Sequence, residues 1–340
     1  MKKLRVLALM HDYMVPPDDI SGHDLATVKW KTEFDVASTL EDIGHDVRKL
    51  GVKDDLGLIR QAIDDFKPHI AFNLMEAFHE VGVFDMNVVS YLELLRLPYT
   101  GCNPRGMLLS RDKALSKKLM AYHRIRVPDF TVFKRGLAIK RPRRLKFPVI
   151  VKSLTQEASI GISQASVVED DEKLRERVKF IHKSVGTDAI AERFIDGREL
   201  YVGVAGNERV QVFPIWEINL SKLPDGAHRI ATDRVKWNVE YQKKHKIKTN
   251  AATDLPAVLS EQIQRVAKRV YRALEMSGYA RMDFRLDADG NFFVMEANAN
   301  PQLAFGEDFS ESAERAGISY DELLQRILNF GLRWQPERPG

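Results

Sequence analysis

Residues 278–301 read Gly-Tyr-Ala-Arg-Met-Asp-Phe-Arg-Leu-Asp-Ala-Asp-Gly-Asn-Phe-Phe-Val-Met-Glu-Ala-Asn-Ala-Asn-Pro, and this stretch decides the fold. Two runs of alternating apolar residues flank Asp289-Gly290, a pair typical of a two-residue hairpin turn. Such a turn places three pairs opposite each other: Ala288 with Asn291, Asp283 with Glu296, and Arg281 with Asn298. The polar members of the last two pairs share one face of the hairpin, because side chains alternate between the faces of a strand.

The paired carboxylates of Asp283 and Glu296 indicate a metal site. Like charges directly opposite each other destabilise a sheet unless something neutralises them, and Mg²⁺ prefers carboxylate and amide oxygens. The run Phe292–Met295 is apolar on both faces, so we expect a central strand, in which a carboxylate needs a partner. The alternative is a solvated hairpin face. We interpret Asp283, Glu296 and Asn298 as ligands of a divalent cation.

The composition is that of an ordinary globular protein. Of 340 residues, 44% are hydrophobic and 29% are charged, and the net charge of +4 is too small to indicate nucleic-acid binding. The apolar runs are too short to span a bilayer. The basic start is interrupted at Arg5 and His11-Asp12, so it predicts a buried strand rather than a signal peptide. The single cysteine, Cys102, excludes an internal disulfide and indicates a reducing cytoplasm.

The first third of the chain alternates strands and helices. This pattern predicts a parallel sheet, and no dinucleotide fingerprint opens the first helix. The expected strands cover residues 4–10, 46–50 and 69–74, and the expected helices cover 31–44, 54–66 and 84–95.

Several lysines follow in positions where an anion would stabilise them. Ser110 or Asp112 could cap a helix that carries Lys113 and runs to His123, although a surface lysine is the usual case. An apolar strand, Phe147–Lys152, ends on a lysine that is expensive to bury unless it is paired.

Two further segments predict loops around a ligand. Residues 155–163 suit a flexible loop that covers phosphates, although Glu157 must point away from them or meet a metal. The long polar stretch from Ser221 to Pro256 has little hydrophobic period, which is typical of a lid.

The hairpin resembles the metal-binding end of ATP-grasp enzymes. Arg281-x-Asp283 followed by Glu296-x-Asn298 is most similar to the D-alanine–D-alanine ligase family, and Leu97–Gly101 and Ala316–Tyr320 resemble that family too. The resemblance covers nearly the whole chain. It implies an α/β ATP-grasp fold preceded by a Rossmann-like parallel-sheet domain. The implied domains are 1–109, 110–196 and 197–340, with the lid at 221–256.

The resemblance also implies a role for each site residue. ATP would be the nucleotide, with two Mg²⁺ ions (or Mn²⁺ as a substitute) on Asp283, Glu296 and Asn298. Glu192 would accept from the adenine amino group and Glu199 from the ribose hydroxyls. The alternative for these two is a glutamate at each end of a domain-joining strand. The remaining implied residues are Lys113, Lys152 and Lys236 at the phosphates, Ser159 and Gly161 in the covering loop, Arg193, Phe194 and Ile195 at the base, and Arg281 at the developing oxyanion, with Arg281, Lys236 and Ser159 as the catalytic set.

The implied activity is a carboxylate–amine ligase that works through an acyl phosphate. Three segments of the family's amino-acid half are replaced here, at residues 11–17, 75–82 and 300–303, so we expect a different carboxylate, amine or both. A phosphotransferase and a non-catalytic nucleotide-binding relative stay open. The expected partners are small amino acids or peptides, with a homodimer left open. The basic residues Lys243, Lys244, His245, Lys246 and Lys248 indicate an acidic substrate or, alternatively, a solvated loop tip.

Overall fold

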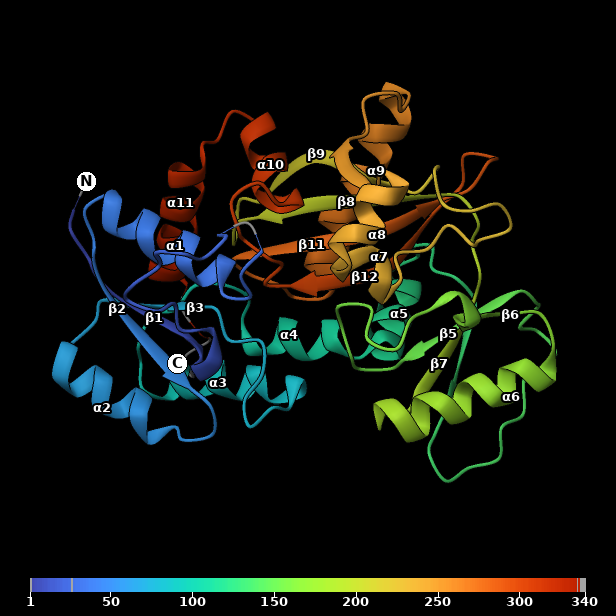
Figure 1. The fold of residues 1–340 in the computed structure, drawn as a ribbon, viewed down its shortest axis with the longest axis horizontal. Helices are drawn as coiled ribbons and strands as arrows, with labels where there is room; N and C mark the ends of the chain where they lie inside the picture. The colour runs from blue at the N-terminus through green and yellow to red at the C-terminus, as the bar shows by residue number, and fades with distance from the viewer. Residues whose placement is uncertain (1, 26, 335, 337–340) are drawn as a thin grey trace.

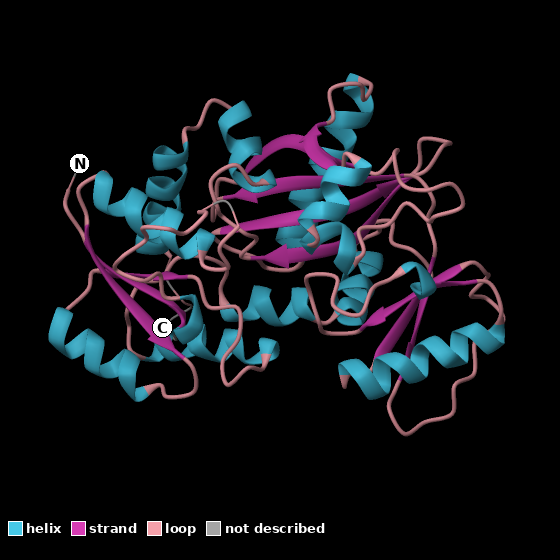
Figure 2. Ribbon diagram, in the orientation of Figure 1, coloured by secondary structure: helices cyan, strands magenta, loops and turns pink. Residues whose placement is uncertain are grey.

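Three sheets organise the protein, which we describe from a computed structural model that covers residues 2–25, 27–334 and 336. Figure 1 shows a parallel sheet near the N-terminus (blue), an antiparallel sheet at the opposite end (green) and a larger antiparallel sheet between and above them (yellow to orange). Figure 2 marks the same strands in magenta. The expected mixed α/β class, with a parallel sheet followed by antiparallel ones, is confirmed. Among the residues that the model covers, no helix is both long and apolar enough to cross a membrane.

The parallel sheet has three strands in the order β2-β1-β3. One face packs on α2 and α3 and the other on α1 and the C-terminal helix α11, so both faces are buried, as parallel sheets require. The predicted strands and helices of this region are confirmed with shifts of a few residues at their ends. The bounds are β1 Arg5–His11, β2 Asp46–Val52, β3 Ile70–Asn73, α1 Lys31–Asp42, α2 Gly57–Phe66 and α3 Asp85–Leu94, with 3-10 turns at Asp12–Met14 and Gly82–Phe84.

Two helices lead from this sheet to the next. The sequence did not predict α4 (Pro104–Arg111), whereas α5 (Lys113–Tyr122) is confirmed. Asp112 caps α5, since its carboxylate accepts hydrogen bonds from the amides of Ala114 and Leu115 at 2.9 Å each. The choice between Ser110 and Asp112 is therefore settled, and Lys113 becomes the first residue of the helix.

The four-stranded sheet is antiparallel and has the order β4-β7-β5-β6. Helix α6 and the turn of π-helix that continues it cover one face through Leu174, Val178 and Ile181. The bounds are β4 Phe130–Phe133, β5 Val149–Ser153, β6 Val167–Val168, β7 Ala189–Arg193 and α6 Asp171–Phe180, with the π-helical turn at Ile181–Val185 and a 3-10 turn at Gln164–Ser166.

The five-stranded sheet is also antiparallel, with the order β10-β9-β8-β11-β12. On β11, Met282 and Phe284 belong to the core that includes α9, whereas Asp283 and Arg285 face the opposite side and line a pocket. The bounds are β8 Arg198–Ala205, β9 Gln211–Asn219, β10 Lys248–Ala251, β11 Tyr279–Leu286, β12 Phe292–Ala299, α9 Ala257–Ala273, α10 Asp308–Arg315 and α11 Tyr320–Arg333. The sequence did not predict α10.

The expected irregular lid is partly regular. Residues 221–256 contain α7 (Asp233–Trp237), α8 (Val239–His245) and the edge strand β10. Each helix is too short for its hydrophobic period to register in a sequence, but each has its own cap. Thr232 caps α7 and Asn238 caps α8 through their side-chain oxygens.

The prediction that the second hairpin strand is central was wrong, because β12 is an edge strand. It is nevertheless well covered, since α4 and α5 pack alongside it, Phe293, Val294 and Ala297 are buried and none of its residues is fully exposed. The amide of Val294 donates to the carbonyl of Arg126 at 3.0 Å, so part of the open edge is hydrogen-bonded. The apolar pattern indicates that this strand is covered, and α4 and α5 cover it rather than a further strand.

The prediction of a two-residue turn at Asp289-Gly290 was also wrong. The amide of Asp287 donates to the carbonyl of Asn291 at 2.9 Å, which leaves a three-residue loop with Gly290 at φ +81°. This loop shifts the register by one residue relative to our prediction, and a β-bulge at Met295 shifts it back. The predicted pairs of Asp283 with Glu296 and of Arg281 with Asn298 are therefore confirmed.

Gly331 tests how closely α11 packs on the parallel sheet. A Cβ at this position would lie 2.2 Å from the carbonyl oxygen of Tyr99. We expect Gly331→Ala to lower the free energy of unfolding by about 1–3 kcal/mol, the usual cost of overpacking. At an open helical position the same change would raise stability by about 0.5–1 kcal/mol. Urea denaturation of both proteins decides the sign, and a gain in stability would contradict this packing.

Candidate active site

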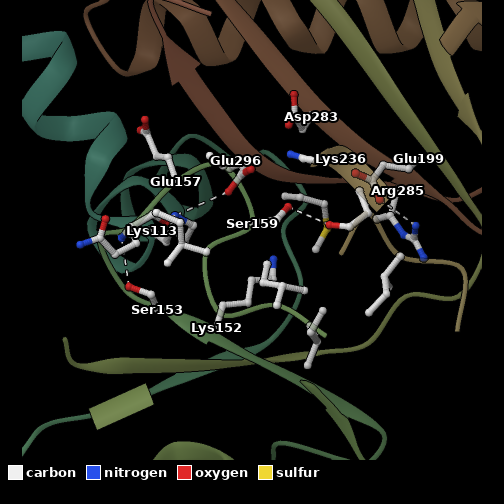
Figure 3. Close-up of a pocket in the computed structure, with 18 of the residues that line it drawn as sticks. Lys113, Lys152, Ser153, Glu157, Ser159, Glu199, Lys236, Asp283, Arg285 and Glu296 are labelled. Carbon is white, nitrogen blue, oxygen red and sulfur yellow. Dashed lines mark hydrogen bonds and ion pairs between the residues drawn. The ribbon is translucent and has the colours of Figure 1, made fainter. Parts of the chain in front are cut away.

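A pocket lies between the four-stranded and five-stranded sheets, beneath the covering loop (155–163) and the lid (221–256), and Figure 3 shows residues that line it. Its walls come from β5, β8, β11, β12, the connection between β7 and β8, the start of α5 and these two loops. The lining residues are Lys113, Ile150, Lys152, Ser153, Gln156, Glu157, Ala158, Ser159, Ile160, Ile162, Phe194, Ile195, Glu199, Ile230, Ala231, Lys236, Asp283, Arg285, Met295 and Glu296.

Three predicted lysines converge on this pocket from different elements. Lys113 begins α5, Lys152 lies near the end of β5 and Lys236 lies on α7 of the lid. Lys113 is only 5% exposed, so the surface-lysine interpretation is wrong for it. An ammonium at the start of a helix is disfavoured by the helix dipole and gains from a nearby anion. The Lys113 ammonium lies 3.7 Å from Glu296 and donates to the carbonyl of Gln156 at 2.7 Å.

Asp283 and Glu296 face each other across the hairpin but differ in pKa. Burial raises the pKa of Asp283 to about 6, against the lowering effect of Arg281, and the facing Glu296 adds to the rise. Burial also opposes ionisation of Glu296, but the nearby lysines, Lys113 first among them, outweigh it and lower its pKa to about 2. The pocket wall thus carries four carboxyl groups, two of them on this hairpin, beside the cations of Lys113, Lys152, Lys236 and Arg285.

The oxygen donors on this face suit a hard divalent cation. Asp283, Glu296 and Asn298 lie on the same side of β11 and β12. The amide nitrogen of Asn298 is buried without a hydrogen-bond partner among the residues described, so its side chain is not committed elsewhere. Within that same part of the chain, no group of three or more histidine, cysteine, aspartate and glutamate residues converges. The donor set is therefore two carboxylates and an amide, which fits Mg²⁺ better than Zn²⁺.

Arg281 is fully engaged by acidic residues. Its guanidinium contacts Asp283 at 2.8 and 3.0 Å and Asp308 at 2.8 Å, and it lies over the ring of Tyr201, 4.5 Å from the centroid. The sequence did not predict Asp308, which belongs to the missed helix α10. Arg281 is absent from the pocket wall and instead supports Asp283 from the side.

Glu192 does not line the pocket. Its side chain has no exposed surface, and its two oxygens lie 3.1 Å from the ammonium groups of Lys117 and Lys152. Glu199, by contrast, lines the pocket beside Phe194 and Ile195. The structure thus brings Glu199 into the pocket wall and places Glu192 behind Lys152. Arg193, Gly161 and Asn298 also lie outside the pocket wall.

The covering loop and the lid touch over the pocket. The hydroxyl of Ser159 donates to the carbonyl of Ala231 at 2.7 Å, and the indole of Trp237 donates to the carbonyl of Ala158 at 3.2 Å. Glu157, whose acidity was unexpected in this loop, pairs with Arg111 at 2.8 Å. Its charge is therefore neutralised without a metal.

The basic cluster of the lid lies away from the pocket. Lys243, Lys244, Lys246 and Lys248 are exposed on α8 and β10, and none of them lines the pocket. The interpretation as a solvated loop tip fits this position, and the inference of an acidic substrate from this cluster loses its support.

The fold and the site can now be compared with known proteins. Residues 118–329 match the family model described as the D-ala D-ala ligase C-terminus. The chain belongs to the D-alanine–D-alanine ligase family.

Relatives in this ligase family match most of the chain. It is 32% identical to a D-alanine–D-alanine ligase of Bordetella petrii over 244 residues, 70% of this chain and 69% of the relative. An uncharacterized protein of Sinorhizobium fredii, y4sG, is 31% identical over 306 residues, 88% of this chain and 86% of the relative. The crystal structure of D-alanine–D-alanine ligase from Bacillus anthracis complexed with ATP has the same fold. Its TM-score is 0.74 at 24% identity, over 97% of this chain and 98% of that chain.

Sequence reasoning missed two buried cations in this ligase-like site. Arg285 is 4% exposed, contacts Glu199 at 3.1 Å and donates to the carbonyl of Ile195 at 3.0 Å. It lies two residues after Asp283, so the strand period could have placed it on the same face. Lys117 lies one helical turn after Lys113, and its partners, Glu192 and Met295, belong to two different sheets.

Glu296→Gln tests the balance of charge in the pocket. The folded pKa of Glu296 is about 2, below the ordinary value of 4.5, so its ionised form stabilises the fold. We expect the variant to lose about 1–3 kcal/mol of unfolding free energy at pH 7. This contribution is complete above pH 4.5 and is lost as pH falls toward 2, so the two proteins should converge in stability on acidification.

Urea denaturation at a series of pH values from neutral to acidic measures that convergence. Glu208→Gln, at an exposed glutamate in the loop between β8 and β9, is the control and should match the parent throughout. Equal stability of Glu296→Gln and the parent at pH 7 would contradict the charge balance.

Proposed function

We propose that the protein is an ATP-dependent carboxylate–amine ligase. A substrate carboxylate attacks the γ-phosphorus of ATP and releases ADP, and an amine then displaces phosphate from the acyl phosphate to form an amide. The observation that carries this proposal is the convergence of Lys113, Lys152 and Lys236 on one pocket with Asp283 and Glu296. Phosphoryl transfer depends on positioning and charge neutralisation, and this arrangement suits both.

The three lysines would neutralise the phosphates from three directions. Lys113 and Lys152 are held by ion pairs with Glu296 and Glu192, so their ammonium groups are oriented before a ligand arrives. Lys236 comes with the lid, so its charge would join the site when the lid closes. Asp283, Glu296 and Asn298 would hold Mg²⁺, for which we propose two ions with Mn²⁺ as a substitute, and bound metal would offset the charge on the transferring group.

The adenosine end would lie where the pocket is apolar. Ile150, Phe194 and Ile230 supply an apolar wall, and Glu199 supplies an acceptor for the ribose hydroxyls. Arg285 holds Glu199 by an ion pair and donates to the backbone at Ile195, so both features are fixed together. This combination supports a nucleotide over a phosphate-free ligand.

The substrates are proposed to differ from a pair of D-alanines. The segments at residues 11–17, 75–82 and 300–303 do not carry the residues that the resemblance leads us to expect. Arg281, which would face the developing oxyanion, is already paired with Asp283 and Asp308. Two aspartates share this one arginine, so the group carries a net negative charge, which suits an amine better than an additional carboxylate.

A screen of carboxylate and amine pairs tests the proposal directly. ADP release is measured for each pair, and the mass of each product is determined. Release that requires both partners, with an amide product, supports the ligase. Release with a carboxylate or alcohol alone, and a phosphorylated product, would replace it with a phosphotransferase. Binding of ATP without turnover on any pair would indicate a nucleotide-binding protein.

Single lysine variants then test the roles within the pocket. Lys152→Met and Lys236→Met should each lower the rate of ADP release by roughly a hundredfold, because each removes a preorganised charge from the phosphates. The triple variant Lys243→Gln, Lys244→Gln, Lys246→Gln is the control, since these lysines are exposed outside the pocket. It should keep the parent rate and Michaelis constants. Retention of the parent rate by Lys152→Met would contradict the assignment.

A further inference from the structure

Lys117 is a buried cation that the proposed chemistry does not use. It lies on α5 one turn after Lys113, its side chain has no exposed surface, and it does not line the pocket. Moving an ammonium group out of water costs several kcal/mol unless good partners replace the water. A lysine is therefore an expensive choice for this position, and its partners should explain it.

Both partners of Lys117 belong to the machinery of the pocket. Its ammonium lies 3.1 Å from one oxygen of Glu192, and the other oxygen of Glu192 lies 3.1 Å from Lys152. The same ammonium donates to the carbonyl of Met295, the bulged residue that directly precedes Glu296. One buried charge thus reaches the four-stranded sheet through Glu192 and the five-stranded sheet through Met295.

The sharing of Glu192 between two lysines affects the lysine that faces the ligand. With Lys117 present, the two lysines together neutralise the single carboxylate of Glu192. The positive charge of Lys152 is therefore only partly compensated and can still attract an anion. Burial lowers the pKa of Lys117, and Lys152 lowers it further, while Glu192 acts in the opposite direction. If Lys117 were neutral, Glu192 would be balanced by Lys152 alone and would hold it back from the pocket.

The contact with Met295 affects the acidic side of the same pocket. The bulge at Met295 restores the register that sets Glu296 opposite Asp283. On an edge strand no neighbouring strand holds the carbonyl of a bulged residue, and here the Lys117 ammonium does so.

We propose that Lys117 is a positioning residue of the nucleotide site and does not touch the ligand. Through Glu192 it controls how strongly Lys152 can attract an anion, and through the carbonyl of Met295 it holds Glu296 in place. This inference rests on the proposed function, since it assumes that the pocket binds a nucleotide. A lysine with a purely structural role would differ from a positioning residue in one respect. Its removal would change stability but not the affinity for phosphates in the protein that remains folded.

The test compares Lys117→Met with Lys118→Met, which removes the exposed lysine next to it on the same helix. Titration calorimetry measures the affinity for a non-hydrolysable ATP analogue with Mg²⁺, and for adenosine. We expect Lys117→Met to weaken binding of the analogue by about 10- to 100-fold, the range seen when outer partners of a site are removed. Adenosine affinity should change far less, and Lys118→Met should match the parent in both.

A double variant covers the case in which Lys117→Met folds poorly. Lys117→Met combined with Glu192→Gln removes both buried charges and frees Lys152, so it should recover most of the parent's affinity for the analogue, a comparison with the parent that does not need the single variant. Unchanged analogue affinity in folded Lys117→Met, an equal loss for analogue and adenosine, or no recovery in the double variant would overturn the proposal. Failure of the parent protein to bind the analogue at all would instead overturn the proposed function.

Discussion

The buried carboxylate of Glu192 is the constraint on which the site depends. A charge with no exposed surface is tolerated only when cations replace its water, and Lys117 and Lys152 do so at 3.1 Å each. These lysines come from α5 and β5, while Glu192 lies on β7. Three elements are therefore fixed relative to one another by one electrostatic requirement. The pocket opens on the side of Lys152, so the interaction that stabilises this region also prepares a cation for a ligand.

The rest of the pocket follows the same balance of charge. Glu296 is stabilised as an anion by the surrounding lysines, whereas Asp283 is stabilised by Arg281 and remains closer to protonation. Two carboxyl groups on one hairpin thus differ in pKa, because burial dominates at Asp283 and the lysines dominate at Glu296. A phosphate ligand or a divalent cation would each find a complementary partner already in place, which is the arrangement that electrostatic preorganisation requires.

The sequence predicted the parallel sheet and the hairpin, because those features depend on local periods and on side chains near each other in the chain. The pocket lysines Lys113, Lys152 and Lys236 are far apart in the chain, and it was the family resemblance that singled them out together. The pairing of Asp283 with Glu296 was right although the turn was wrong, since the longer loop and the bulge at Met295 cancel. The role of Lys117 could not be predicted, because its partners lie 75 and 178 residues away in two sheets. The edge position of β12 was missed for a related reason. Apolar patterns report that a strand is covered but not whether strands or helices cover it.

The two ends of the lid lie side by side in the five-stranded sheet, which lowers the entropy cost of closing this long loop. Lys248 pairs with Asn219 in the register of β10 and β9, so the segment between them begins and ends on one rung of the sheet. The free energy of closing such a loop depends on bringing its ends together, and here the sheet has already done so. Opening the lid breaks its hydrogen bonds to the covering loop, such as those of Trp237 and Ala231. It also breaks the hydrogen bond from Arg285 to the carbonyl of Arg229 and the apolar packing of Val235 against Trp216. The balance between a closed and an open lid is therefore set by this packing, by these hydrogen bonds and by a ligand beneath them, and not by the entropy of bringing the ends of the loop together.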